Sequence, residues 1–221
     1  MTKTIAMIPA RMGSQRLKKK NLCEILPGIT LIEYVINKCL AAECFDEVWI
    51  NSENEEFSKF ADNKNIFFHK RPEKLGDNNA TSEQFIYEFL QSHESTHIVQ
   101  VHSIAPLLTI NEIKSFTNFF VESDNNVLLS YIADQIECVY LDKPVNFTFN
   151  KKTNSQDLSP IQRVTWSITG WKSDDYIRAY EAGECATYSG KIGFYEVDKI
   201  SGHVIKTQHD LDIAKALLET L

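Results

Sequence analysis

Short apolar runs alternate along this chain with amphipathic segments, and this alternation constrains the fold more than any other feature of the sequence. The runs have the length and the β-branched and aromatic content of buried strands, which we expect at residues 5–8, 46–51, 66–69, 97–101, 127–132 and 191–197. Between them, apolar residues recur at helical spacing, and we expect helices at about 30–42 and 52–63, after 81, from 109 to about 121, and up to about 218. The alternation predicts an α/β fold of three layers, αβα, with a mostly parallel central sheet.

Three of the expected helices begin at a capping sequence, in which a threonine is followed three residues later by glutamate or glutamine. These sequences start at Thr30, Thr81 and Thr109. In such a box the threonine oxygen and the glutamate or glutamine side chain each bind a backbone N–H that the first turn leaves unpaired. The starts of these helices are therefore predicted more sharply than their ends.

A cluster of basic side chains follows the first apolar run. It comprises Arg11, Arg16, Lys18, Lys19 and Lys20. Gly13 and Ser14 allow the backbone to turn closely just after the strand, where open α/β sheets bind their ligands. The cluster therefore indicates a site for a polyanion, although a run of lysines is also typical of a solvated loop.

Charge and composition limit the class of ligand. The net charge of the 221-residue chain is −7, so the basic loop is a local exception, which argues against a nucleic-acid-binding protein and favours a small anion. No apolar run approaches the roughly 20 residues that span a bilayer, and we see no signal peptide, so we expect no membrane partner and a cytoplasmic location. Five cysteines without a CxxC pair are typical of reduced thiols.

Residues 8–14, Ile-Pro-Ala-Arg-Met-Gly-Ser, are followed six residues later by Lys20 and Asn21. This succession resembles the opening signature of the acylneuraminate cytidylyltransferases (CMP-sialic acid synthetases) and, more distantly, that of the CMP-Kdo synthetases. The chain keeps the arginine, one glycine, the serine and the closing Lys-Asn of the signature. It departs at Met12, Gln15 and Lys18, where the family has glycine, lysine and proline.

The resemblance continues to the end of the chain. An Arg-Pro segment at 71–77, a strand-end segment at 100–109 and a final strand and helix follow in the family's order. The resemblance implies a single domain over residues 1–221 with the Rossmann-like fold of the nucleotide-diphospho-sugar transferases. It also implies an excursion at about 138–186, here rich in aromatic residues, that contacts a second subunit, so we expect a homodimer.

The resemblance implies a reaction as well: transfer of CMP from CTP to an acidic sugar of the nonulosonic or ulosonic kind, with release of pyrophosphate. Arg11 and Lys20 are the expected catalytic residues, because an arginine fork and a lysine ammonium can neutralise a triphosphate. The residues expected to bind the nucleotide are Ala10, Arg11, Gly13, Ser14, Lys20, Asn21 (at the cytosine edge), Arg71 and Ser82. Those expected to bind the sugar are Gln100, Gln162 and Arg163. Two alternatives stay open, a non-catalytic nucleotide- or sugar-binding paralogue and a CTP-dependent transferase with another acidic acceptor.

The family implies Mg²⁺ as cofactor, but the usual carboxylate ligands are missing. Val204 and Lys206 stand at the positions of the two metal-binding aspartates, and the aspartate of the CMP-Kdo branch aligns approximately with Ile104. None of these side chains is a ligand for Mg²⁺. Either the triphosphate holds the ion with help from nearby side chains, or Lys206 replaces part of its charge, or transfer activity has been lost. The candidate helpers are Glu53, Asp77, His102 and Asp210.

Overall fold

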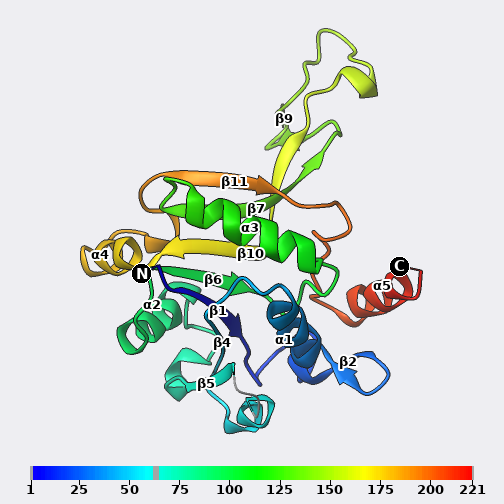
Figure 1. The fold of residues 1–221 in the computed structure, drawn as a ribbon. Helices are drawn as coiled ribbons and strands as arrows, with labels where there is room; N and C mark the ends of the chain where they lie inside the picture. The colour runs from blue at the N-terminus through cyan, green and yellow to red at the C-terminus, as the bar shows by residue number, and fades with distance from the viewer. Residues whose placement is uncertain (1, 62–64, 221) are drawn as a thin grey trace.

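The computed structural model describes residues 2–61 and 65–220. Its central element is a seven-stranded sheet in the order β11-β7-β10-β6-β1-β4-β5 (Figure 1). The strands are β1 (Thr4–Pro9), β4 (Glu47–Ser52), β5 (Ile66–Lys70), β6 (His97–Val101), β7 (Val127–Asp134), β10 (Ile161–Lys172) and β11 (Ile192–Glu196). β10 is antiparallel to β6 and β7, whereas β1–β4, β1–β6, β4–β5 and β7–β11 are parallel. The predicted α/β fold with a mostly parallel sheet is therefore confirmed.

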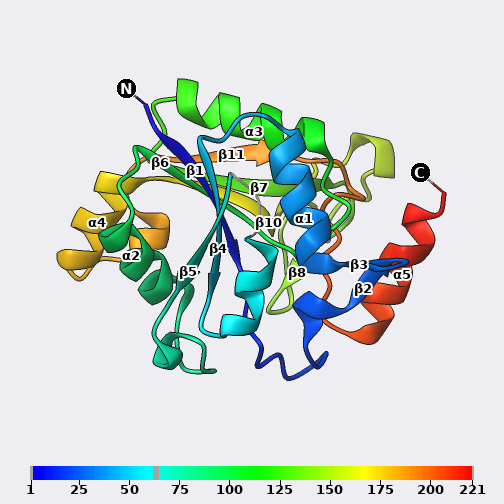
Figure 2. The same ribbon diagram turned by 60° about the horizontal axis from the view of Figure 1, so that its bottom comes forward.

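Helices cover both faces of this sheet (Figure 2). α1 (Leu31–Ala41) and α3 (Ile110–Glu122) bury apolar side chains on one face, and α2 (Ser82–Ser92) and α4 (Ser173–Glu181) on the other. The capping boxes predicted for α1, α2 and α3 are confirmed. α5 (Gln208–Leu218) begins at a further capping box, formed by Thr207 and Asp210, that the sequence analysis did not single out.

α5 lies outside the sheet and packs against a small hairpin (Figure 2). The hairpin consists of β2 (Glu24–Leu26) and β3 (Ile29–Thr30). Ile25, Ile205 and Leu211 belong to the apolar cluster between them. This packing brings the segment before α5 against the basic loop that follows β1.

Short 3₁₀ helices occur in the connections: η1 (Lys20–Leu22), η2 (Glu55–Phe60), η3 (Glu73–Leu75), η4 (Ser155–Asp157) and η5 (Ala186–Tyr188). The helix predicted at 52–63 is thus shorter than expected and is of the 3₁₀ type. Residues 62–64 of that prediction lie outside the described residues.

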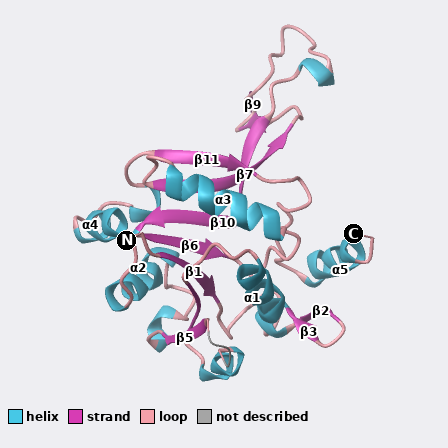
Figure 3. Ribbon diagram, in the orientation of Figure 1, coloured by secondary structure: helices cyan, strands magenta, loops and turns pink. Residues whose placement is uncertain are grey.

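The excursion predicted at 138–186 is narrower in the structure. Residues 161–172 form β10 inside the central sheet and residues 173–181 form α4, so the segment that leaves the body is the arm, residues 135–160 (Figure 3). The arm holds β8 (Val139–Tyr140), β9 (Lys143–Pro144) and η4. The sequence pattern missed β10 because a bulge between Val164 and Thr169 interrupts its alternation, with Trp166 at a φ of 58°.

Candidate active site

A cavity of about 190 Å³ lies at the carboxyl ends of β1 and β6. It is lined by Pro9, Ala10, Arg11, Ser14, Lys20, Asn21, Arg71, Phe85, His102 and Ile104. The residues of this set that the sequence predicted as nucleotide-binding are Ala10, Arg11, Ser14, Lys20, Asn21 and Arg71. The structure therefore brings most of the predicted nucleotide-binding residues to one place.

Lys20 stands in this cavity at the start of η1. Its Nζ donates a hydrogen bond to the carbonyl oxygen of Ile205 at 3.2 Å. Burial, and then repulsion by Arg16 and Arg11, lowers the pKa of the Lys20 ammonium, whereas Asp210 acts in the opposite direction. A bound polyanion would offset this repulsion, so the cavity is electrostatically suited to a phosphate chain.

Arg71 is buried beneath the loop that follows β1, with 2% of its surface exposed. Its Nη2 lies 3.0 Å from Glu53 Oε2 and donates to the carbonyl oxygen of Ala10 at 3.2 Å. The guanidinium also lies over the Phe85 ring, 4.7 Å from its centre. Glu53 Oε1 accepts the backbone N–H of Met12 at 2.8 Å, so one carboxylate joins the loop to Arg71.

This structural role of Glu53 was not predicted from its sequence position, which suggested only a candidate helper for the metal ion. The available signal was its position directly after β4, at the same sheet edge as the basic loop. Gly76 allows the neighbouring loop to approach, because a Cβ there would lie 2.4 Å from Glu53 Cγ. Glu53 is thus enclosed from two sides.

Asn21 and Gln100 are buried and bind protein groups. Asn21 Nδ2 donates to the carbonyl oxygen of Arg11 at 3.0 Å, and its Oδ1 accepts from Ser103 Oγ at 2.7 Å. Gln100 lies behind the cavity wall, where its Oε1 is 2.9 Å from His102 Nε2. These hydrogen bonds hold the residues of the cavity wall in place. The contact of Asn21 with cytosine and that of Gln100 with the sugar stay predictions.

Besides Gln100, four predicted residues lie outside the cavity lining. Gly13 is exposed in the loop, and Ser82 is exposed at the first position of α2. Gln162 and Arg163 lie on β10 beside β7, where Arg163 Nε donates to Asp134 Oδ2 at 2.9 Å. None of these four residues lines the cavity.

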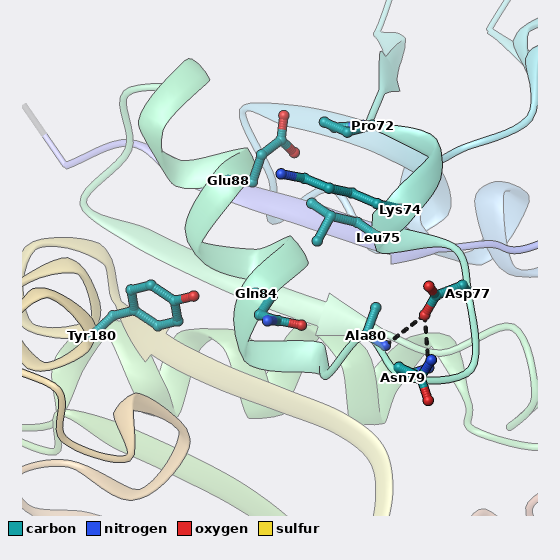
Figure 4. A pocket seen from close by; sticks show the side chains of 9 residues that line it. All are labelled: Pro72, Lys74, Leu75, Asp77, Asn79, Ala80, Gln84, Glu88 and Tyr180. Atoms are coloured by element: carbon teal, nitrogen blue, oxygen red, sulfur yellow. Dashed lines mark hydrogen bonds between the residues drawn. The ribbon is translucent and has the colours of Figure 1, made fainter.

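A second hollow, of about 440 Å³, lies beside the loop formed by residues 72–80 (Figure 4). It is lined by Pro72, Lys74, Leu75, Asp77, Asn79, Ala80, Gln84, Glu88 and Tyr180. Asp77 Oδ1 accepts the backbone N–H groups of Asn79 and Ala80 at 2.7 and 2.9 Å, so this carboxylate holds the loop. Because Lys74 and Glu88 carry opposite charges, the hollow does not select an anion.

The side chains present do not fit an Mg²⁺ ion held by the protein. Beside Val204 and Lys206, the nearest carboxylate in sequence is that of Asp210, whose Oδ2 accepts the backbone N–H groups of Lys206 and Thr207 at 2.9 and 2.7 Å. Glu53 is already bound in its ion pair. In the part of the chain that the structure describes, no group of three or more His, Cys, Asp or Glu side chains could hold a metal ion.

The family described as cytidylyltransferase matches residues 5–221 of the chain. The chain belongs to this family. The family and the enzyme class that the opening signature predicted are therefore confirmed. Within the described parts of this cytidylyltransferase, no helix has both the length and the apolar character needed to cross a membrane.

Two cytidylyltransferases are similar in sequence to this chain, one over most of its length and one over less than half. The pseudaminic acid cytidylyltransferase of Campylobacter jejuni is 33% identical over 197 residues, which are 79% of this chain and 83% of that protein. The N-acylneuraminate cytidylyltransferase of Escherichia coli is 34% identical over 102 residues, 45% of this chain and 24% of that protein. The solved structure of CMP:2-keto-3-deoxy-manno-octonic acid synthetase complexed with CTP matches 99% of both chains with a TM-score of 0.70 at 16% identity, a likeness of fold.

Proposed function

We propose that this cytidylyltransferase transfers CMP from CTP to a nonulosonic acid and releases pyrophosphate. The observation that carries the proposal is the pair of cations in the cavity. Lys20 and Arg11 repel each other, and the side-chain contacts that they make are to neutral oxygens, of Ile205 and Asn78, at 3.2 Å each. A triphosphate supplies the negative charge that this arrangement lacks.

The acceptor in this proposal is a sugar acid of the pseudaminic kind. Support comes from the relative that matches 79% of the chain, which is named for pseudaminic acid, and from a shorter match to an N-acylneuraminate enzyme. The attacking hydroxyl of such an acid would approach the α-phosphorus in line with the leaving pyrophosphate. Lys20 and Arg11 would neutralise the charge that develops on the phosphates, and Ser14 would add a hydrogen bond.

The nucleoside end of CTP would lie towards Asn21, Arg71 and Phe85, which line the remaining wall. Asn21 and Arg71 bind loop backbone and so hold this wall in shape. In this proposal Mg²⁺ reaches the site together with CTP, because the side chains that the structure describes build no site for the ion. The enzyme would work in the cytoplasm, where CTP is made and where its five free cysteines stay reduced.

We also propose that the arm contacts a second copy of the chain. Its tip exposes large apolar side chains, with Tyr140, Leu141 and Phe149 each more than 70% exposed. Exposed apolar side chains that lie together on a surface are typical of interaction sites. The family resemblance makes a second subunit the expected partner.

The proposed reaction is tested by measuring pyrophosphate release from CTP and Mg²⁺ with a panel of acidic sugars that includes pseudaminic and N-acetylneuraminic acids. Lys20→Ala should abolish turnover, whereas Lys18→Ala, in the same loop but exposed and outside the cavity, should leave it near the wild-type rate. Wild-type silence across the panel with retained CTP binding would support the non-catalytic paralogue. Equal rates for both variants would refute the role of Lys20.

A further inference from the structure

His102 directly follows β6 and lines the cavity beside Lys20. Its Nε2 lies 2.9 Å from Gln100 Oε1. An amide oxygen accepts hydrogen bonds and cannot donate them, so Nε2 carries the ring proton and Nδ1 presents a lone pair. The backbone N–H of His102 donates to the carbonyl oxygen of Ser167 at 3.2 Å, within the bulge of β10, so the ring and the backbone are both held.

The ring of His102 is neutral at pH 7. Burial, and then the positive charge of Lys20, lowers the pKa of His102 from 6.5 to about 4. The other charged side chains that line this cavity, Arg11 and Arg71, are cations. Asp210 lies outside the lining, and its negative charge raises the pKa of Lys20. Of the lining residues, His102 alone offers an unprotonated nitrogen at neutral pH, and none offers a carboxylate.

We propose that His102 is the general base of the transfer, with Nδ1 accepting the proton of the attacking hydroxyl. This inference rests on the proposed function. As the O–H bond breaks, the acceptor oxygen forms a bond to the α-phosphorus of CTP and the proton moves to Nδ1. The bond from the α-phosphorus to the α,β-bridging oxygen breaks, and its electron pair leaves with pyrophosphate. The imidazolium returns its proton to water when the products leave.

Binding of CTP prepares His102 for this role. The triphosphate pairs with Lys20 and offsets the positive charge that disfavours the imidazolium. The pKa of His102 therefore rises in the complex towards the working pH, where a general base is most effective. Gln100 is a positioning residue, because its Oε1 fixes the tautomer of the His102 ring. The buried Nε2 of Gln100 has no hydrogen-bond partner among the described residues.

The first test compares His102→Gln and His102→Ala with the wild type in pyrophosphate release, CTP binding by calorimetry and thermal unfolding. We expect kcat to fall by about 10²–10⁴-fold with CTP affinity retained, and added imidazole to restore part of the rate to His102→Ala. His209→Ala, exposed at the start of α5, is the matched control and should keep the wild-type kcat. A folded His102→Gln enzyme with a kcat within about threefold of wild type would overturn the general-base role and leave the proposed function intact.

The second test does not need turnover. NMR of the ring nitrogens of His102 should show an unprotonated Nδ1 in the free protein and a higher pKa after CTP is added. A protonated Nδ1, or a pKa that CTP leaves unchanged, would overturn the inference. No pyrophosphate from the wild type with any acidic sugar would instead refute the proposed function, and the general-base role with it.

Discussion

The ion pair between Glu53 and Arg71 predicts a large loss of stability for Glu53→Gln. The two side chains are 13% and 3% exposed, so the substitution leaves the Arg71 guanidinium buried without its counter-charge. Removing one partner of a buried pair costs about 3–5 kcal/mol. The amide oxygen of the new side chain can still accept from Met12, so we assign the loss to the charge and not to the loop contact. For a chain of this size, that loss corresponds to a fall in Tm of about 6–20 °C.

Equilibrium unfolding in urea measures this effect. Glu55→Gln is the matched control, because Glu55 pairs with Lys70 at 3.5 Å while 71% exposed, and an exposed pair contributes about 0–1 kcal/mol. Repeating Glu53→Gln on an Arg71→Met background should reduce its cost, since no buried charge then remains. If Glu53→Gln and Glu55→Gln destabilise equally, the reasoning about the buried pair is refuted.

Four further predictions follow from local geometry. Gly76→Ala should destabilise the protein by about 1–3 kcal/mol in urea unfolding, because its Cβ would lie 2.4 Å from Glu53 Cγ, and an unchanged midpoint would contradict this packing. Burial lowers the pKa of Lys38 from 10.5 to about 8, so between pH 8 and 10.5 the unfolded chain binds more protons than the folded one. The free energy of unfolding therefore rises with pH in this range, and Lys38→Met should flatten the rise in unfolding experiments from pH 8 to 10. Leu141→Glu should shift sedimentation from dimer to monomer, and a wild-type monomer would refute the role of the arm. Calorimetry should find no saturable Mg²⁺ binding without CTP. A tight Mg²⁺ site would contradict the finding that the described side chains do not fit the ion.

The fold was predictable where the sequence signal is local. Capping boxes at Thr30, Thr81 and Thr109 fixed the starts of three helices, and β-branched runs marked the parallel strands. β10 was missed because its bulge at Trp166 breaks the alternation of buried and exposed residues that identifies a strand. The predicted excursion therefore extended too far along the chain, into residues that form β10 and α4.

The candidate site was predictable to the same extent. Arg11, Ser14 and Lys20 lie in one stretch, so their convergence could be expected before the structure was known. Glu53 pairs with Arg71, and His102 lies near the charge of Lys20. In both cases packing brings together residues from separate elements. Such contacts leave no periodic pattern in the sequence.

Phosphorus NMR of wild-type protein with CTP, Mg²⁺ and pseudaminic acid tests the central claim most directly. We predict that the CTP signals are replaced by those of pyrophosphate and of one phosphodiester. The Lys20→Ala protein should leave CTP unconverted, whereas the Lys18→Ala protein should convert it as the wild type does. Unchanged CTP with every acidic sugar tried, in a folded protein that binds the nucleotide, would contradict the claim that the cation cluster performs this transfer.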